Sequence, residues 1–122
     1  MASPLGALGM VTLHVRDFPA SLAFYRDTLG LKLLDKVDEV KWAQFEVAPN
    51  VQLGIHQDDA ESGHRHPGGS SGFYFGVPDV DAAVSELARR GVTVVEKPQD
   101  APFGRWASIE DPSGNEMMLI KP

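Results

Sequence analysis

Residues 15–31 read VRDFPASLAFYRDTLGL and set the plan of the whole chain. Asp17 can accept hydrogen bonds from the first turn of a helix, and Pro19 follows where its missing N–H has no consequence. Gly30 can end the helix, because glycine readily adopts the left-handed conformation that often follows the last helical residue. The pattern predicts a helix over residues 19–29 between two strands. One face of that helix carries Leu22, Tyr25, Arg26 and Leu29.

The same pattern returns in residues 77–92, VPDVDAAVSELARRGV. Asp17 and Asp79 are 62 residues apart, whereas Gly30 and Gly91 are 61 apart, so one residue is gained or lost inside or after the helix. Further matches follow at offsets of 63 and 64 residues: WAxFE of 42–46 with WAxIE of 106–110, Pro49 with Pro112, and residues 53–55 with 117–119. The chain is therefore an internal repeat of two halves.

Alternating apolar residues predict the remaining strands. The expected strands are 8–16, 31–37, 41–48, 51–56, 72–77, 92–96, 104–110 and 116–121, with a second helix over 80–90. A long polar, Gly-rich loop over residues 57–71 is expected between the halves, and a turn-rich stretch around Pro98 and Pro102. Each half is then strand, helix and three strands. The prediction is an α+β fold of tandem βαβββ modules, about 8–57 and about 72–121, within one domain.

The composition and net charge of the chain argue against several classes of function. A chain of 122 residues is one domain in length, and its net charge of −6 argues against a nucleic-acid or anionic-membrane partner. There are no cysteines, so disulfides and thiolate metal sites are excluded. No secretion signal or membrane-spanning run is seen, and a cytoplasmic location is expected.

The chain resembles the vicinal oxygen chelate superfamily, also called the glyoxalase/bleomycin-resistance/dioxygenase family. The resemblance depends on Val15-x-Asp17, Ser21-x-x-Phe24-Tyr25, Leu29-Gly30-Leu31 and Asp111-Pro112-x-Gly114-Asn115. It implies an open, cleft-enclosing half-barrel of mixed sheets with the helices outside. Members include metal-dependent lyases, dioxygenases, thiol transferases and metal-free drug-binding proteins, so the fold does not choose a function. Asp111-Pro112-Ser113-Gly114-Asn115 is interpreted as a turn without chemistry.

Metal enzymes of this family usually place one ligand near the start of the first strand and one in the last strand of each half. The resemblance puts these positions at Met10, Gly72, Gly54 and Met118, and the internal repeat pairs them in the same way. None of the four offers a carboxylate or imidazole to a hard divalent ion. No metal and no other cofactor is therefore expected.

A displaced site is the alternative. His14, His56 and Glu116 share the parity of those positions and are candidates for a shifted divalent-metal site or for acid–base catalysis. The simpler interpretation is that the histidines are hydrogen-bond partners of a ligand, of water or of each other. His64, Arg65 and His66 are interpreted as a solvated cluster in the loop, or else as a flap that touches an anionic ligand.

By parity, the face of each sheet away from its helix mixes flat aromatics, methionines and polar groups, which suits a small-molecule pocket. The predicted ligand-binding residues are Met10, His14, Trp42, Gln44, Glu46, His56, Tyr74, Trp106, Ser108 and Met118, with Gln52, Glu110 and Glu116 beside them. Trp42 and Trp106 are equivalent in the repeat and are expected to flank a planar ligand. The acidic groups favour a cationic ligand.

Three functions follow from this pattern. The first is a metal-free protein, similar to bleomycin-resistance proteins, that sequesters an antibiotic or metabolite; the resemblance implies a homodimer. The second is a lyase, isomerase or dioxygenase-like enzyme with a displaced metal or metal-free acid–base chemistry. The third is a regulatory or assembly subunit in which the tryptophans fill a protein interface.

Overall fold

A computed structural model describes residues 2–57 and 67–122 of the chain. The elements are β1 (Met10–Val15), α1 (Phe18–Ala23), η1 (Phe24–Thr28), β2 (Lys32–Val37), η2 (Asp38–Val40), β3 (Trp42–Ala48), β4 (Val51–Gln57), β5 (Gly69–Gly76), α2 (Val80–Arg89), β6 (Thr93–Ala101), β7 (Gly104–Glu110) and β8 (Asn115–Lys121). The predicted order of strands and helices is confirmed. His64, Arg65 and His66 lie outside the described residues.

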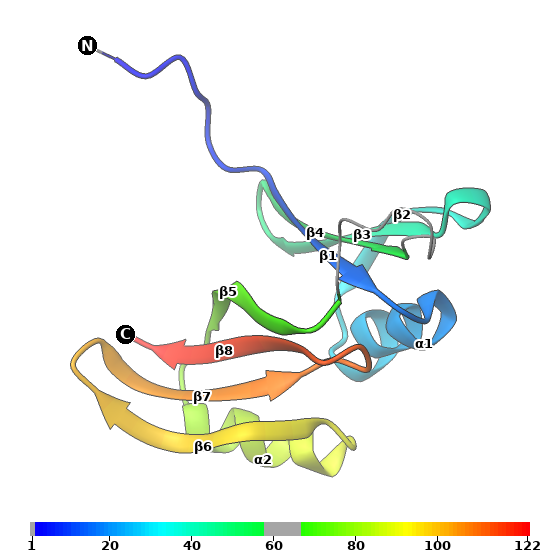
Figure 1. Ribbon diagram of the computed structural model, residues 1–122. Helices are drawn as coiled ribbons and strands as arrows, with labels where there is room; N and C mark the ends of the chain where they lie inside the picture. The colour runs from blue at the N-terminus through cyan, green and yellow to red at the C-terminus, as the bar shows by residue number, and fades with distance from the viewer. Residues whose placement is uncertain (1, 58–66) are drawn as a thin grey trace.

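The strands form two four-stranded sheets with the same topology, β1-β4-β3-β2 and β5-β8-β7-β6. In each sheet the first and last strands of the half are parallel, and the other pairs are antiparallel. This confirms the repeated βαβββ plan with two mixed sheets, and the described strands form no closed barrel. The two sheets and their helices can be followed in Figure 1, where the N-terminal residues run away from both sheets.

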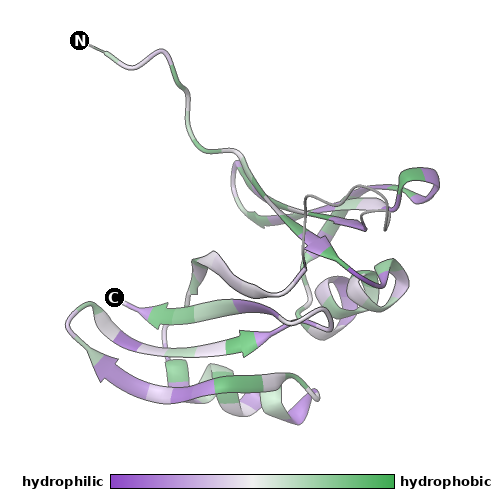
Figure 2. Cartoon of the chain, in the orientation of Figure 1, coloured by the Kyte–Doolittle hydropathy of each residue, from purple (hydrophilic) through white to green (hydrophobic). Residues whose placement is uncertain are grey.

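The helix-facing sides of both sheets meet in one hydrophobic core. Tyr25 and Phe45 of the first half are fully buried there, and so is Met117 of the second half. Polar and apolar residues follow one another in short segments along the strands, as sheets with one covered face require (Figure 2). Because both covered faces contribute to the same core, the two open faces lie on its outside.

The two helices begin alike and end differently. Asp17 Oδ1 accepts from the backbone N–H of Ala20 at 3.1 Å, and Asp79 Oδ1 accepts from that of Ala82 at 3.0 Å. The first helix then widens into the π-turn η1, in which the N–H of Leu29 donates to the carbonyl of Phe24, five residues earlier. A π-turn holds one more residue than an α-turn. It therefore explains the one-residue difference in the repeat.

The widened turn also corrects the predicted helix face. Phe24 and Tyr25 are buried, whereas Arg26 points to solvent and pairs with its neighbour Asp27. The Arg26 guanidinium hydrogen-bonds the Asp27 carboxylate, which lowers the pKa of Asp27. Arg26 is therefore not part of the packed face that regular helical spacing predicted.

Two predicted boundaries were wrong in the second half. β6 continues through Pro98, although a turn was expected there. Proline is tolerated because β6 is the edge strand, and its pairing with β7 is irregular between Glu96 and Gln99. β5 begins at Gly69 rather than at 72, and its pairing shifts between Ser70 and Tyr74.

Candidate functional site

The first open face is the exposed side of the first sheet, and on it the Trp42 indole lies over Gly54. A Cβ placed on Gly54 would lie 2.5 Å from Cη2 of Trp42 and 3.2 Å from Sδ of Met10. Gly54 is itself buried. The indole and the thioether thus fill the space that a side chain at position 54 would need.

Hydrogen bonds fix the orientation of this indole. Trp42 Nε1 donates to Gln44 Oε1 at 3.2 Å, and Gln44 Nε2 donates to Gln52 Oε1 at 2.8 Å. All three side chains are half-buried. The row is a preformed platform with one aromatic face and polar edges, an arrangement that suits a flat ligand.

Two histidines adjoin the platform. His14 and His56 are paired residues of the parallel strands β1 and β4, with ring centroids 6.2 Å apart at 65°. His56 also lies 6.2 Å from the Trp42 ring. Glu46 lies on the same strand as Trp42 and is exposed. The predicted first-half residues Met10, His14, Trp42, Gln44, Glu46 and His56 therefore belong to one sheet face.

The four family metal positions do not fit a metal ion here. Gly54 lies under the indole, Met10 contributes only its thioether, and Gly72 and Met118 belong to the other sheet. Among the described residues, no group of three or more His, Asp or Glu side chains is placed to hold a metal ion. Glu116, on β8 of the second sheet, does not join His14 and His56 in such a group, so the displaced three-ligand site is not formed within the described chain.

The second open face is the exposed side of the second sheet, and it is mostly apolar. Tyr74 and Met118 are paired residues of β5 and β8, and Ile120 follows on the same side of β8. With Phe103 and Pro122 they line a hollow of about 350 Å³. Tyr74 is 49% exposed and Phe103 53%, so their rings are accessible from solvent. Of these residues the sequence pattern identified Tyr74 and Met118, and it missed Phe103, Ile120 and Pro122; Phe103 lies in a turn, where alternation gives no information.

Trp106 lies beside this hollow. Its ring centroid is 6.5 Å from that of Phe103, and its paired residue on β8 is Ile120. Among the described residues no ring contact joins Trp106 to Trp42, because the Trp42 ring lies next to His56 and the Trp106 ring next to Phe103. The two indoles therefore belong to two separate faces of one chain.

Ser108 is buried and does not lie on the exposed surface of the second open face. Its side chain is fully buried, and its Oγ accepts a hydrogen bond from the backbone N–H of Glu96 at 3.2 Å, where the β6–β7 pairing is irregular. The alternation of β7 correctly placed Ser108 on the side of Trp106, but neighbouring side chains cover it. We therefore leave it out of the proposed ligand contacts.

The turn after β7 connects the two halves. Asp111 is buried and accepts four hydrogen bonds: Oδ1 from the N–H groups of Ser113 and Asn115, and Oδ2 from Tyr25 Oη and Asn115 Nδ2. Burial, and then the neighbouring carboxylate, raise the pKa of Tyr25 above its usual range. The sequence predicted only a turn here. The hydrogen bond from Tyr25 could not be predicted, because no local pattern in the sequence indicates a partner so far along the chain.

The same turn holds the strand that carries His14 and the residues that precede β5. Asn115 Nδ2 donates to the carbonyl of His14 at 2.9 Å, and Asn115 Oδ1 accepts from the N–H of Gly68 at 2.9 Å. Arg16 donates through its backbone N–H to Ser113 Oγ at 2.8 Å and through its guanidinium to the carbonyls of Ser113 and Pro67. These contacts fix the first open face relative to the second half.

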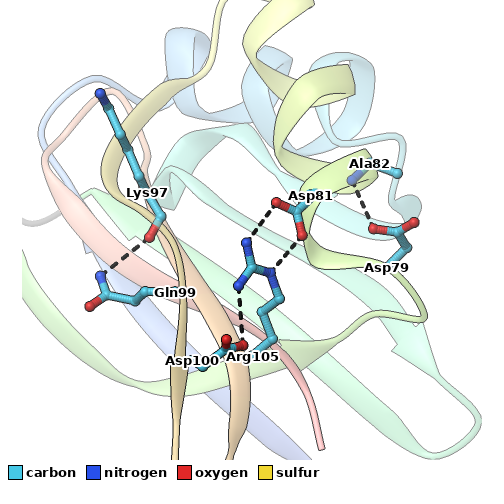
Figure 3. A network of polar contacts seen from close by, with 7 residues as sticks. All are labelled: Asp79, Asp81, Ala82, Lys97, Gln99, Asp100 and Arg105. Atoms are coloured by element: carbon cyan, nitrogen blue, oxygen red, sulfur yellow. Dashed lines mark hydrogen bonds and ion pairs between the residues drawn. The ribbon is translucent and has the colours of Figure 1, made fainter.

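A charged network lies on the helix side of the second half, apart from the open faces (Figure 3). Arg105 donates to both carboxylate oxygens of Asp81 at 2.6 and 2.9 Å and to Asp100 at 3.1 Å. These hydrogen bonds lower the pKa of Asp81 and raise that of Arg105. The network ties α2 to the β6–β7 hairpin, which also carries Phe103.

Two βαβββ halves that share one core define a recognisable class of protein. The chain belongs to the Glyoxalase/Bleomycin resistance protein/Dioxygenase superfamily, whose family model matches residues 7–119. The family expected from the sequence motifs is thus confirmed. The described residues contain no helix that is long and apolar enough to cross a membrane.

Relatives of this chain within the family are named for different functions. The chain is 32% identical over 122 residues to the anthracycline biosynthesis protein DauV of Streptomyces sp. (strain C5), covering 95% of this chain but only 42% of DauV. It is 34% identical over 123 residues to a lactoylglutathione lyase of Pseudomonas aeruginosa, covering 93% of this chain and 69% of the lyase.

A solved structure supports the same fold. TnmS3, an antibiotic binding protein from Streptomyces sp. CB03234, superposes with a TM-score of 0.82 at 27% identity, covering 99% of each chain. The family thus includes relatives described as binding proteins and as enzymes, and the residues of this chain's own faces have to distinguish them.

Proposed function

We propose that this protein binds a planar small molecule, such as an antibiotic or a metabolite, without a metal ion, and sequesters it. The observation that carries the proposal is the Trp42 indole, which lies over Gly54 and against the Met10 sulfur. This arrangement offers a flat apolar surface where a ligand to a metal would otherwise stand. The name of TnmS3 as an antibiotic binding protein supports the same class of function.

The proposal includes a homodimer. The helix-facing sides of both sheets form one core, so the two open faces of a chain lie outside it. A ligand flanked by Trp42 and Trp106 therefore needs these residues from two chains. In this arrangement Trp42 and Gln44 of one copy and Trp106, Tyr74 and Met118 of the other line each cleft, and His14, His56 and Glu46 orient the ligand's polar groups.

Fluorescence of single-tryptophan variants tests the proposal. Trp106→Phe leaves Trp42 as the only indole, and Trp42→Phe leaves Trp106. Titration with planar polycyclic antibiotics, anthracyclines among them, is expected to quench both saturably, and dialysis against EDTA leaves the affinity unchanged. Light scattering is expected to give twice the chain mass. Absence of quenching by every compound, while acrylamide still quenches Trp42, contradicts the binding function.

The second candidate is a lyase-type enzyme, favoured by the lactoylglutathione lyase relative and by the adjacent His14 and His56. Two imidazoles on neighbouring strands are candidates for a general base or for part of a metal site completed by another chain. Metal analysis of the purified protein distinguishes the two functions. A stoichiometric divalent ion that is lost in His56→Ala favours the enzyme.

A further inference from the structure

The second open face has an acidic end and an apolar end. Along β8, Glu116, Met118 and Ile120 share a face, and the rise of a strand places Glu116 about 7 Å from Met118. Glu110 is the paired residue of Glu116 on β7. Two carboxylates thus lie directly opposite each other at one end of the face, and the aromatic hollow of Tyr74, Phe103, Met118, Ile120 and Pro122 lies at the other.

No cation from the described residues pairs with these two carboxylates. Among residues 2–57 and 67–122, no ion pair involves Glu110 or Glu116, and both side chains are half-buried. Like charges directly opposite on adjacent strands destabilise a sheet. A cationic group placed between them would remove that repulsion, and the net charge of −6 adds to the attraction for a cation.

The apolar hollow suits an aromatic group attached to such a cation. Its lining side chains are apolar apart from the Tyr74 hydroxyl, and Tyr74 and Phe103 present accessible rings. Phe103 is backed by Trp106, with ring centroids 6.5 Å apart, so a bound ring would meet an aromatic pair. A volume of about 350 Å³ lies within the range of small-molecule sites.

We infer that the second open face binds an aromatic amine, with its flat ring against Tyr74 and Met118, at the end of the hollow nearer the carboxylates, and its protonated nitrogen directed towards Glu110 and Glu116. The inference rests on the proposed function, since it names the ligand class for the same pair of faces. In this arrangement the second half binds both the ring and the positive charge of the ligand. The first half contributes the Trp42 platform and the amide groups of Gln44 and Gln52.

Three probes with one ring system and different charge test the inference. Calorimetric titration of the full chain with tryptamine, N-acetyltryptamine and indole-3-acetate compares a cation, a neutral compound and an anion. Tryptamine is expected to bind at least fivefold more tightly than N-acetyltryptamine, and indole-3-acetate most weakly. The preference for the amine is expected to fall as NaCl is raised from about 0.05 to about 0.5 M, because the screening length shortens over that range.

Matched variants assign the effect to residues. Glu116→Gln is expected to reduce the preference for tryptamine to less than about twofold while binding of N-acetyltryptamine is retained. Phe103→Ala is expected to weaken the cation and the neutral probe alike, by roughly two- to tenfold, the range that loss of an aromatic pair produces. Glu39→Gln and Leu34→Ala, exposed changes on the first half, are the charge and apolar controls and are expected to change neither affinity.

Two outcomes overturn the inference. One is equal affinity for tryptamine and its acetylated form in the unmodified protein. The other is an unchanged affinity for both tryptamine and N-acetyltryptamine in Phe103→Ala, which would place the bound ring elsewhere than in the hollow. Saturable quenching of Trp42 by planar antibiotics in either case would leave the proposed binding function intact.

Discussion

Tyr25 of the first half donates its phenolic hydrogen bond to Asp111 of the second half, at 2.7 Å and fully buried. The two residues are 86 positions apart in the sequence. The hydroxyl completes the set of four donors around one buried carboxylate, and the ring packs against Phe45 of the first sheet. One side chain therefore joins a packed core to a polar turn.

Tyr25→Phe tests the strength of this connection. The variant keeps the ring but removes one hydrogen bond to a buried carboxylate, and such a loss costs about 1.5–3 kcal/mol. The free energy of unfolding from urea titration is expected to fall by about 2 kcal/mol without a change in the m-value. Phe24→Leu is a packing control that leaves the hydrogen bond in place. An unchanged midpoint in Tyr25→Phe would show that Asp111 has no need of this donor.

Gly54→Ala tests the packing of the Trp42 platform. The new Cβ would lie 2.5 Å from Trp42 Cη2, so the indole has to move, and overpacking of this kind costs about 1–3 kcal/mol. Gly76→Ala is the matched control in β5, because a Cβ there meets nothing within 4 Å. Urea unfolding and the Trp42 emission maximum in a Trp106→Phe background report the change.

A second background makes this test specific. Trp42→Phe removes Cη2 and Cζ2, so Gly54→Ala is expected to destabilise the Trp42→Phe protein much less than the unmodified one. The coupling energy of the double-mutant cycle is then about 1 kcal/mol or more. Additive effects of the two changes would place the indole elsewhere than over Gly54.

Arg105→Ala tests the network of Figure 3 through its pH dependence. Hydrogen bonding by Arg105 lowers the pKa of Asp81 in the folded state below the unfolded value of about 3.9. The stabilisation is therefore present above about pH 4 and is lost as the pH falls through the lower folded-state value. Arg105→Ala is expected to melt at a slightly lower temperature than the unmodified protein at pH 7 and at the same temperature in strong acid. Because these groups are exposed, 1 M NaCl is expected to reduce the difference at pH 7. A difference that persists in strong acid and salt would assign the effect to packing.

Asn115→Ala tests how the turn holds the first open face. The change removes the donor to the carbonyl of His14 and the acceptor of the Gly68 N–H. The unfolding free energy is expected to fall by about 2 kcal/mol, the sum of a few buried hydrogen bonds. The amide of Gly68 is expected to gain more in hydrogen-exchange rate than the amides of α2. The lost hydrogen bond lets the chain open locally at Gly68 without unfolding the whole protein. Uniform acceleration at both places would mean that the turn contributes only global stability.

The sequence was sufficient for the fold because its signals are local. Asp17 and Asp79 cap helices, Gly30 and Gly91 stop them with positive φ values of 77° and 86°, and alternation gives the strands. The one-residue difference between the halves predicted an irregularity, and the π-turn η1 is that irregularity. Its effect on Arg26 could not be foreseen, because the phase of a helix face depends on where the extra residue is absorbed.

The candidate site was predicted less completely. Parity placed Trp42, Gln44, His14 and His56 correctly on one sheet face, since side chains alternate along strands. Parity cannot report burial by neighbours, so Ser108 was included although it is covered. Of the residues that line the hollow, Phe103, Ile120 and Pro122 were missed. Phe103 belongs to a turn, where alternation gives no information, whereas Ile120 has the same parity as Met118 and could have been included.

Sharing a core has a thermodynamic consequence for a duplicated chain. The buried side chains of Tyr25, Phe45 and Met117 belong to one continuous cluster, so neither repeat encloses its own apolar interior. Heating is therefore expected to give a single calorimetric transition whose van't Hoff and calorimetric enthalpies agree. Either repeat expressed by itself would expose apolar surface that its twin normally covers, and would aggregate or remain unfolded.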